Sequence, residues 1–479
     1  MEPEAIDKYR FRVPKSSMKG MNADVILYSS NVLMEKLKRD RTLQQAANAA
    51  TLPGICGNVM VMPDGHEGYG FPVGGVAAFD ADEGVISPGA IGFDINCGIR
   101  IIKTNIEEAE VRKHVKRLSD EMFSSVPSGL DSRLKTGFGA EDLERVAVEG
   151  AGYLVEKGYG TADDIEHMEE SGCMEGADFS KVSQRAKSRG RHQLGTLGAG
   201  NHFLEVQKIE KVYDSRLARA YGIYEGQIVV MVHTGSRGFG HQICSDYLRI
   251  LAEYQSRKGI ILVDPELSYA HVKSPEAEDY LKAMKCGVNF AFANREMITD
   301  IIRKSFAKIF MKSPDELGMD LLYDLSHNIA KLEEHSVDGM QRKVYVHRKG
   351  ATRSFYKGRK EIPKKYRNYG QPVLIPGSMG TASYILAGGA GAMAETFGSA
   401  CHGAGRVMSR HQALREIGAE KTLSSMRKKE IELRVRDARL VSEEAEWVYK
   451  DIEEVISVVS GAGLASPVSR TVPVAVIKG

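Results

Sequence analysis

The sequence predicts an α+β protein that folds as one large domain, with strands and helices mixed around a central cleft. The chain has 479 residues, of which 42% are apolar, so it can bury a sizeable core. Short apolar runs broken by glycine are typical of strands and tight turns, and longer charge-rich stretches favour helices. Residues that could carry chemistry run from Asp94 to His402. If they converge, residues 1–479 form a single body, although the length alone would allow two or three domains.

Each expected element has its own signal along the chain. Residues 59–102 predict strands and tight turns, residues 107–170 are mostly helical, and FLEVQKI at 203–209 predicts a strand. Ser274-Pro275 and Ser313-Pro314 each resemble an N-cap followed by a first-turn proline, and Glu316 would complete a capping box at the second. Residues 409–459 predict helices, with Ser442 as an N-cap. The chain ends on an apolar run, VPVAVIKG.

Composition excludes several classes of protein. The net charge is only +2, so any attraction to nucleic acid must come from local patches. Six cysteines without a short-spaced pair do not make a disulfide scaffold and favour a reducing cytosol. The N-terminus lacks the apolar segment of a signal peptide, and no stretch approaches the length of a membrane span. We expect a soluble, cytoplasmic protein that is not exported.

Five side chains indicate a metal site. Asp94 precedes Cys97 by three positions in GFDINCG, and His202, His233 and His327 each follow or precede an apolar run beside a polar or Gly-rich turn. A thiolate can bridge two cations, and this mixed ligand set without CxxC or HxxxH pairs fits a catalytic centre better than a closed structural one. Ligand type alone favours zinc. The alternative is that each histidine is an ordinary, partly buried residue at a strand end.

Glycine clusters around His402 indicate an anion site. GTLGAGNH, HTGSRGFG, IPGSMGTAS and CHGAGR can each expose successive backbone N–H groups to a phosphate. A neutral His402 imidazole beside such groups could attack phosphorus. Alternatively, His402 is a sixth metal ligand beside Cys401. Neither a P-loop nor GxGxxG is present, and Met62 occupies the lysine position of a K-x-D-G nucleotidyl-transfer motif.

Residues 342–370 form a strongly basic segment. They contain eleven Lys or Arg and one acid, Glu361. Aromatic residues among cations are what single-stranded nucleic acid requires, because bases stack on the rings while the cations follow the backbone. The alternative is a solvated basic face. A second basic cluster lies at residues 185–191. The interleaved aromatic residues are Tyr345, Phe355, Tyr356, Tyr366 and Tyr369.

Eight segments together resemble the RtcB family of RNA-splicing ligases, particularly its archaeal members. They are GFDINCG, GAGNHFLEV, HTGSRG, DLSHN, RKGAT, PGSMGTASY, CHGAGR and the terminal VIKG. The resemblance runs from about residue 20 to the last residue, and no key position departs from it. It implies the single-domain fold of that family, with a central metal and nucleotide cleft, two manganese ions and GTP as a substrate.

The resemblance also implies a role for each site residue. Asp94, Cys97 and His202 would hold one ion, Cys97, His233 and His327 the other, and His402 would be the catalytic residue that carries GMP. The nucleotide would contact Asn201, Phe203, Glu205, Asn328, Pro376, Gly377, Ser378, Met379, Ser383, Gly403, Ala404, Gly405, Tyr449 and Lys478. We expect RNA to contact Arg237 and three cations of the basic segment, Lys349, Arg353 and Lys357. Manganese comes from the resemblance, whereas the ligand types favour zinc.

The activity implied is GTP-dependent joining of RNA 2′,3′-cyclic phosphate or 3′-phosphate ends to 5′-hydroxyl ends. It would proceed through a guanylylated histidine and an RNA-3′-pp-5′-G intermediate, in tRNA splicing and RNA repair. The expected partners are tRNA exon halves and the activating protein archease. Two other classes fit parts of the sequence. One is a dinuclear metallophosphoesterase that acts on RNA ends without nucleotide, and the other is a metal-stabilised RNA-binding protein.

Overall fold

Seven strands form the first of two large sheets. The computed structural model describes residues 1–134 and 138–479, and the order of this sheet is β1-β2-β3-β4-β5-β13-β12. Only the pair β3 and β4 is parallel. The strands are β1 Glu4–Ala5, β2 Arg10–Val13, β3 Val25–Tyr28, β4 Ile55–His66, β5 Val73–Asp80, β12 Asn328–Val337 and β13 Met340–Lys349.

The second sheet has eight strands and contains the C-terminal run. Its order is β11-β7-β9-β8-β19-β16-β15, with β18 parallel to β19. The expected strand at FLEVQKI is confirmed as part of β8, and the terminal apolar run lies in β19 up to Lys478. The strands are β7 Gly98–Glu107, β8 Phe203–Val212, β9 Gln227–Thr234, β11 Leu321–Ser326, β15 Pro372–Ile375, β16 Ser383–Gly388, β18 Glu432–Val435 and β19 Ala465–Lys478. Two small ladders pair β6 Val85–Ile86 with β10 Ala270–His271 and β14 Ala351–Arg353 with β17 Ser399–Cys401.

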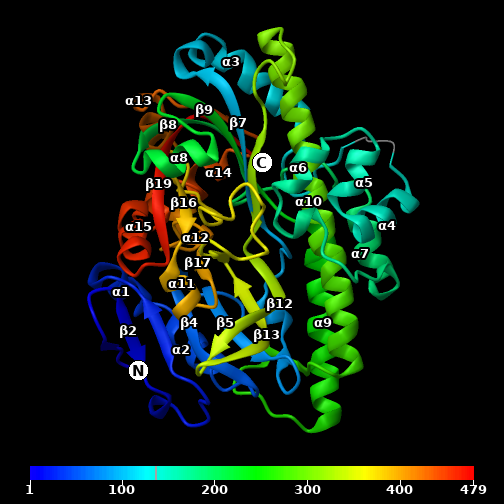
Figure 1. Cartoon of the computed structure of the whole chain (residues 1–479), viewed down its shortest axis with the longest axis vertical. Coiled ribbons are helices and arrows are strands. Elements are labelled where there is room, and N and C mark those ends of the chain that lie inside the picture. The colour runs from blue at the N-terminus through cyan, green and yellow to red at the C-terminus, as the bar shows by residue number, and fades with distance from the viewer. Residues whose placement is uncertain (135–137) are drawn as a thin grey trace.

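Helices lie on both sides of the sheets, and the longest among the described residues is α10. Figure 1 shows α10 (Pro275–Phe310) running along one side of the molecule beside α9 (Arg237–Lys258), with α4, α5 and α7 near it. The Ser274 side chain accepts a hydrogen bond from Ala277 N, so the expected N-cap is confirmed. The other helices are α1 Asn31–Leu37, α2 Thr42–Ala49, α3 Glu108–Ser125, α4 Ala140–Glu149, α5 Ala151–Glu156, α6 Ala162–Glu166, α7 Gln184–Gly190, α8 Ser215–Tyr221, α11 Ala390–Glu395, α12 Arg410–Glu416, α13 Ala419–Lys428, α14 Arg439–Glu443 and α15 Ile452–Gly461.

Two predicted helix starts are wrong. Ser313 and Glu316 do form the reciprocal bonds of a capping box, but only a turn follows, because the chain reverses at Gly318 and enters β11 at Leu321. Ser442 lies inside the short helix α14 rather than capping a helix. The next long helix, α15, begins instead after Asp451, whose side chain accepts from Glu453 N. Local capping signals cannot show where tertiary pairing stops a helix.

The two broader helical predictions hold in part. Helices α3 to α6 occupy much of residues 107–170, and positions 135–137 of that range lie outside the described residues. Residues 409–459 contain α12 to α15, but strand β18 interrupts them because it pairs with β19. Among residues 1–134 and 138–479, no helix is long and apolar enough to cross a membrane. The α+β prediction is confirmed.

The chain crosses between the two large sheets at the candidate site. β11 of the second sheet ends at Ser326, and β12 of the first sheet begins at Asn328, so His327 is the single residue between them. Cys97 immediately precedes β7, and His202 immediately precedes β8. Strand ends from both sheets therefore deliver site residues that are far apart in the sequence.

Candidate active site

The five predicted metal ligands converge. Asp94, Cys97 and His202 form one group, and Cys97, His233 and His327 form another, with the ligand atoms of each group within 4.8 Å of one another. Cys97 Sγ lies 3.4 Å from His202 Nε2 and 3.2 Å from His233 Nε2. The His233 and His327 Nε2 atoms are 3.1 Å apart, and His202 Nε2 is 2.9 Å from Asp94 Oδ2. Cys97 is thus the member common to both groups.

Strand register and one tight turn set this arrangement. His233 is the penultimate residue of β9, where it pairs with Ile99 of β7 and Phe203 of β8, so Cys97 and His202 lie close to it. Asn96 has a left-handed backbone (φ 51°), and Cys97 N donates to Asp94 O over 2.9 Å. Arg295 of α10 donates to the carbonyl groups of Asn96 and Thr234, which fixes the turn against the end of β9.

Glycine is required at one position beside the ligands. A Cβ atom on Gly235 would lie 2.6 Å from both Asp94 Oδ1 and Oδ2, closer than real Cβ contacts. The HTGSRG segment therefore supplies His233 and then lets the Asp94 carboxylate approach its backbone. Ser236 Oγ donates to Asp94 Oδ1 over 3.3 Å and helps to hold the carboxylate.

Burial keeps the imidazoles neutral. It lowers the pKa of both His233 and His327 well below the ordinary histidine value, so both retain a lone pair near neutral pH. His202 Nδ1 lies 3.0 Å from Leu197 O, and this contact orients Nε2 towards Asp94 and Cys97. Burial, and then Asp94, raise the pKa of the Cys97 thiol, an effect that a bound cation would reverse.

The donor set fits a cation. Two neutral imidazole nitrogens only 3.1 Å apart can share at most one proton, and a thiol and a carboxylate are aimed at the same space. A divalent ion would satisfy these lone pairs together. Three imidazoles, a thiolate and a carboxylate suit borderline first-row ions, and two groups that share one sulfur suit two ions.

His402 lies beside these groups at the end of β17. Its ring centroid is 4.9 Å from that of His327, and its Nδ1 is 2.5 Å from Asp64 Oδ2. The same carboxylate oxygen accepts from His402 N and Gly403 N. Because Nδ1 faces Asp64, Nε2 is the nitrogen left for chemistry. His402 belongs to neither ligand group among the described residues, so the alternative of a sixth ligand has no geometric support.

Two glycines bring backbone close to this histidine. Gly350 has a φ of +60°, and a Cβ there would lie 2.3 Å from Val73 Cγ1 and 3.1 Å from His402 Cε1. Gly405 has a φ of +74°, and its Cβ would lie 2.1 Å from Asp64 O. The RKGAT and CHGAGR segments thus need glycine for close approach, not only for a turn.

A cavity of about 300 Å³ joins the ligand groups to His402. Asp94, Cys97, His233 and His327 line it, as do twelve of the fourteen predicted nucleotide contacts. Those twelve are Asn201, Phe203, Asn328, Pro376, Gly377, Ser378, Met379, Gly403, Ala404, Gly405, Tyr449 and Lys478. This set includes two of the predicted glycine-rich anion turns. The cavity therefore offers polar walls to a phosphate and apolar walls to a nucleobase ring.

The other two predicted contacts, Glu205 and Ser383, lie behind the wall. Gly377 N donates to Ser383 Oγ over 3.1 Å, and Gln207 Nε2 donates to Glu205 Oε2 over 2.7 Å and to Ser383 Oγ over 3.2 Å. Burial raises the pKa of Glu205 to about 7. Their contact with a nucleotide stays a prediction.

The sequence analysis missed several residues of the site. Asp64 stands out in the sequence only as part of an incomplete K-x-D-G motif, and His66, Arg406, Arg410 and Glu444 also line the cavity. Glu444 is buried and accepts from Lys478 Nζ (3.1 Å), Arg406 Nη1 (3.0 Å) and the Tyr449 hydroxyl. No short sequence motif identifies such a network, because its members are separated in the sequence and their pairing is seen only in the folded chain.

The basic segment is not one exposed surface, and two of its predicted RNA contacts are buried. Lys349 is buried in the lining of the 300 Å³ cavity, where it donates to the carbonyl groups of Tyr69, Phe71 and Gly89, and its contact with RNA stays a prediction. Arg353 is 2% exposed and paired with Glu169 and Glu170. Each residue is the last of a strand, and a cationic side chain can be buried there when carboxylates or carbonyl groups satisfy it. Lys357 alone of the three is exposed.

The aromatic residues and Arg237 divide in the same way. Phe355 and Tyr366 are fully buried, so bases cannot stack on them, whereas Tyr356 and Tyr369 are exposed. Arg237 is 8% exposed and donates to Thr196 Oγ1 and Gly129 O, each over 3.3 Å. It braces the loop beside His202 and does not present a free guanidinium. The second basic cluster is exposed at Arg185, Arg189 and Arg191, in and after α7.

Fold and site together define an α+β protein in which a candidate metal centre of two ligand groups faces a histidine across one cavity. A family model described as tRNA-splicing ligase RtcB matches residues 45–479. The chain therefore belongs to the RtcB family, as the sequence motifs indicated.

Individual relatives agree with this assignment over nearly their full length. A tRNA-splicing ligase RtcB of Thermococcus kodakarensis is 53% identical over 474 residues, covering 99% of this chain and 98% of the relative. The protein of that name from Archaeoglobus fulgidus is 49% identical with the same coverage. RNA-splicing ligase RtcB homolog 1 of Entamoeba dispar is 44% identical over 481 residues, covering 98% of this chain and 89% of the relative.

Proposed function

We propose that the protein is an RNA ligase of tRNA splicing that uses GTP and two manganese ions to join 2′,3′-cyclic phosphate or 3′-phosphate ends to 5′-hydroxyl ends. One observation carries the proposal: His402 and the two ligand groups that share Cys97 open onto the same cavity. Family membership supports the RNA ligase class. The finer chemistry rests on what this geometry allows.

The ligand groups would hold the two ions, Asp94, Cys97 and His202 on one side and Cys97, His233 and His327 on the other. When bound, the ions would supply positive charge that neutralises phosphate oxygens. The choice of manganese follows the family, since thiolate and imidazole by themselves suit zinc as well.

His402 is proposed as the nucleophile. Its Nε2 lone pair would attack the α-phosphorus of GTP, forming a P–N bond while the bond from that phosphorus to the bridging oxygen breaks and pyrophosphate leaves with the electron pair. The Nδ1 atom lies 2.5 Å from Asp64 Oδ2, so the carboxylate would stabilise the positive charge that develops on the imidazole. Asp64 also fixes the ring by accepting from the His402 and Gly403 backbone.

The stored guanylate would then activate the RNA end. Water opens a 2′,3′-cyclic phosphate to a 3′-phosphate, and an oxygen of that phosphate attacks the phosphorus bound to His402. The P–N bond breaks, which leaves an RNA-3′-pp-5′-G end. The 5′-hydroxyl of the second strand attacks the 3′-phosphorus, loses its proton and displaces GMP. A phosphate with a poor leaving group thereby acquires a good one.

The nucleotide is proposed to lie against the turn of Pro376 to Met379 and the loop of Gly403 to Gly405, which line the cavity. Lys478, held by Gly200 O and Glu444, supplies a buried ammonium at the same wall. Its pKa is lowered by burial although Glu444 raises it, so a bound phosphate would favour its charged form.

Labelling with [α-³²P]GTP and Mn²⁺ tests the assignment. We expect covalent GMP on wild-type protein and on His411→Ala, an exposed histidine of α12, and none on His402→Ala. Label that persisted on His402→Ala would refute the nucleophile. A dinuclear metallophosphoesterase, which needs only the ligand groups, would trim RNA ends without GTP and would give no adduct.

Two further expectations belong to this proposal. Archease would act as the activating protein, so adding it should raise the number of turnovers per site and not the yield of a single turnover. The protein would work in the cytosol, where reducing conditions keep Cys97 free; all six cysteines are unpaired in the structure.

A further inference from the structure

Three aromatic rings meet at the edge of the candidate active site. Phe93 lines the cavity of about 300 Å³ and directly precedes Asp94. The His241 ring stacks on the Phe93 ring, with centroids 4.9 Å apart and an angle of 25° between the planes. The Tyr69 ring meets Phe93 edge-on, with centroids 5.2 Å apart. Tyr69 is 38% exposed and His241 is also exposed, so this ring cluster extends from the cavity lining to the surface.

The fold holds the outer rings in place. The buried Lys349 ammonium donates to Tyr69 O over 2.5 Å, and Gly70 N donates to Glu266 Oε2 over 2.7 Å. A Cβ atom on Gly70, which has a φ of +65°, would lie 2.6 Å from Glu266 O, so the turn after Tyr69 is pressed against that segment. His241 lies in the second turn of α9. A base that stacks on these rings therefore orders little protein backbone.

Exposed arginines lie beside the ring cluster. Helix α7 packs on α9 (Figure 1), and Arg189 of α7 donates to the side chain of Gln242, the residue after His241, over 3.1 Å. Arg189 is exposed, as are Arg185 and Arg191 of the same basic cluster. Burial, and then the charge of Arg189, lower the pKa of His241, so its ring is neutral at pH 7.

Carboxylates near the ring cluster divide between its two ends. Glu266 and the exposed Glu67 lie at the Tyr69 end. At the other end, Asp246 accepts two side-chain hydrogen bonds from within the protein. A phosphate is therefore favoured beside Arg189, and Tyr69 is suited to a base alone. Rings for bases next to cations for the backbone are what single-stranded nucleic acid requires.

The ring cluster and His402 lie beside different halves of the metal centre. His402 is next to His327, which belongs to the ligand group that lacks Asp94. Phe93 adjoins Asp94, which belongs to the group that lacks His327. The two groups share only Cys97. An RNA end between the two halves would therefore have guanylate on one side and the rings on the other.

The sealing step needs this separation. In an in-line displacement, the attacking oxygen and the leaving group lie on opposite sides of the phosphorus. The proposed leaving group is GMP, which would lie on the His402 side of the cavity. The 5′-hydroxyl must then approach from the Asp94 side, where the ring cluster lies.

We propose that the ring cluster binds the first bases of the RNA strand that carries the 5′-hydroxyl, by stacking, with Arg189 on a phosphate of that strand. This inference rests on the proposed function, because it takes RNA ends as the substrates and His402 as the carrier of guanylate. Stacking does not read the edges of a base, so the cluster should accept all four bases.

The test measures the anisotropy of two fluorescein-labelled heptaadenylate RNAs, with Mn²⁺ and without GTP. One exposes only a 5′-hydroxyl, because the label occupies its 3′ end, and the other exposes only a 3′-phosphate. Tyr69→Ala with His241→Ala should bind the 5′-hydroxyl RNA about tenfold more weakly, because two stacking surfaces are lost. Binding of the 3′-phosphate RNA should stay within about twofold of wild type, because the rings do not hold that strand.

Two variants are matched controls. Tyr69→Phe with His241→Phe keeps both rings and should bind the 5′-hydroxyl RNA within about twofold of wild type. Tyr213→Ala with Tyr224→Ala removes rings that are 45% and 43% exposed, near the ends of β8 and β9 remote from the metal ligands. It should bind both RNAs like wild type.

Fluorescence of 2-aminopurine reports stacking directly on wild-type protein. The base replaces the first or the sixth adenine of the 5′-hydroxyl RNA, and stacking on an aromatic ring quenches it. Quenching on binding should be stronger at the first position, and Tyr69→Ala with His241→Ala should remove the difference. Arg189→Gln should lower the salt slope of binding by about 0.7, the contribution of one neutralised phosphate, whereas Arg117→Gln on exposed α3 should not change it.

Four results would each overturn the proposal. They are equal weakening of the two RNAs by the alanine variant, unchanged binding of the 5′-hydroxyl RNA by that variant, weak binding by the phenylalanine variant, and equal quenching at the two positions. Because no GTP is present, a missing GMP adduct on His402 would overturn the proposed function and leave these binding results standing.

Discussion

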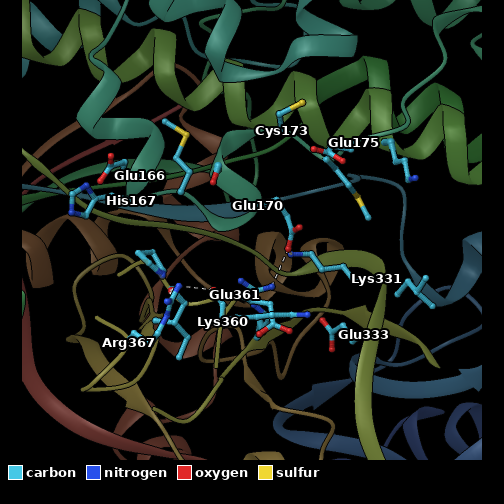
Figure 2. Close-up of a pocket in the computed structure, with 18 of the residues that line it drawn as sticks. Glu166, His167, Glu170, Cys173, Glu175, Lys331, Glu333, Lys360, Glu361 and Arg367 are labelled. Atoms are coloured by element: carbon cyan, nitrogen blue, oxygen red, sulfur yellow. Dashed lines mark hydrogen bonds and ion pairs between the residues drawn. The ribbon is translucent and has the colours of Figure 1, made fainter. Parts of the chain in front are cut away.

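The candidate active site differs in its charges from a second cavity (Figure 2), which has a volume of about 840 Å³ and is lined mainly by residues 163–175 and 330–367. In the candidate active site, burial keeps His233, His327 and the Cys97 thiol uncharged, so lone pairs converge without a balancing cation. In the second cavity, buried Lys331 and Arg353 are balanced by Glu169 and Glu170. The first site therefore fits a cation, whereas the buried charges of the second cavity are balanced within the protein. Changes in the two cavities should have different consequences.

Loss of a shared ligand in the candidate active site should have the largest effect. Cys97→Ala removes a member of both groups and should abolish binding of both ions, while His327→Ala should spare the group of Asp94, Cys97 and His202. Changes outside the ligand shell commonly cost 10- to 100-fold in metal affinity, so loss of a ligand should cost more than about 100-fold. Metal content after dialysis, measured by mass spectrometry, should be two ions per chain for wild type, one for His327→Ala and none for Cys97→Ala. Cys401→Ala, buried but outside the groups, is the control, and two ions on Cys97→Ala would contradict the shared role.

Arg353→Glu should destabilise the fold beside the second cavity instead of removing a ligand site. It places a third carboxylate beside Glu169 and Glu170, and breaking a buried pair costs about 3–5 kcal/mol of unfolding free energy. Urea denaturation should show this loss, while Lys357→Glu, on the exposed part of the basic segment, should stay within about 0.5 kcal/mol of wild type. This replaces the sequence-based expectation that both residues contact RNA. Equal stability of the two variants, with RNA binding lost only in Arg353→Glu, would restore that expectation.

Glu205 should produce a smaller, pH-dependent effect. Burial raises its pKa to about 7, so the carboxyl is mostly neutral below that pH and ionises as the pH rises through it. If the ionised form accepts from guanine N–H groups, GTP affinity should fall about tenfold between pH 8 and pH 6, about fivefold of it below pH 7, and should level off above pH 8. Isothermal titration of GTP binding gives the profile, and Glu205→Gln should flatten it. A wild-type profile with no change between pH 6 and pH 8 would remove Glu205 from the nucleotide site.

The parts of this molecule that the sequence could predict share one property: the signal is local. GFDINCG, HTGSRG and CHGAGR each contain a candidate site residue together with a glycine that its close packing needs, so the sequence alone identifies them. The Ser274-Pro275 start of α10 was local as well. The sequence could place Asp94 near His327 only on the assumption that distant strands are neighbours. In the structure β7 pairs with both β9 and β11, which satisfies that assumption.

The failures depended on partners far away in the sequence. Lys349 and Arg353 belong to a segment with the composition of an RNA-binding surface. Contacts with Gly89, Glu169 and Glu170 nevertheless hold their charged groups in the interior. Ser313 and Glu316 satisfy a capping box, yet pairing of β11 with β7 ends the helix before it begins. The Asp64 contact with His402 joins residues 338 positions apart, which no spacing rule detects.

Crystals soaked in Mn²⁺ and measured at the manganese absorption edge test the central claim most directly. The account predicts two anomalous peaks on either side of Cys97 Sγ, one beside Asp94 and His202 and one beside His233 and His327, both open to the cavity that contains His402. A single peak that contacts neither group, or two peaks that do not share Cys97, would contradict it.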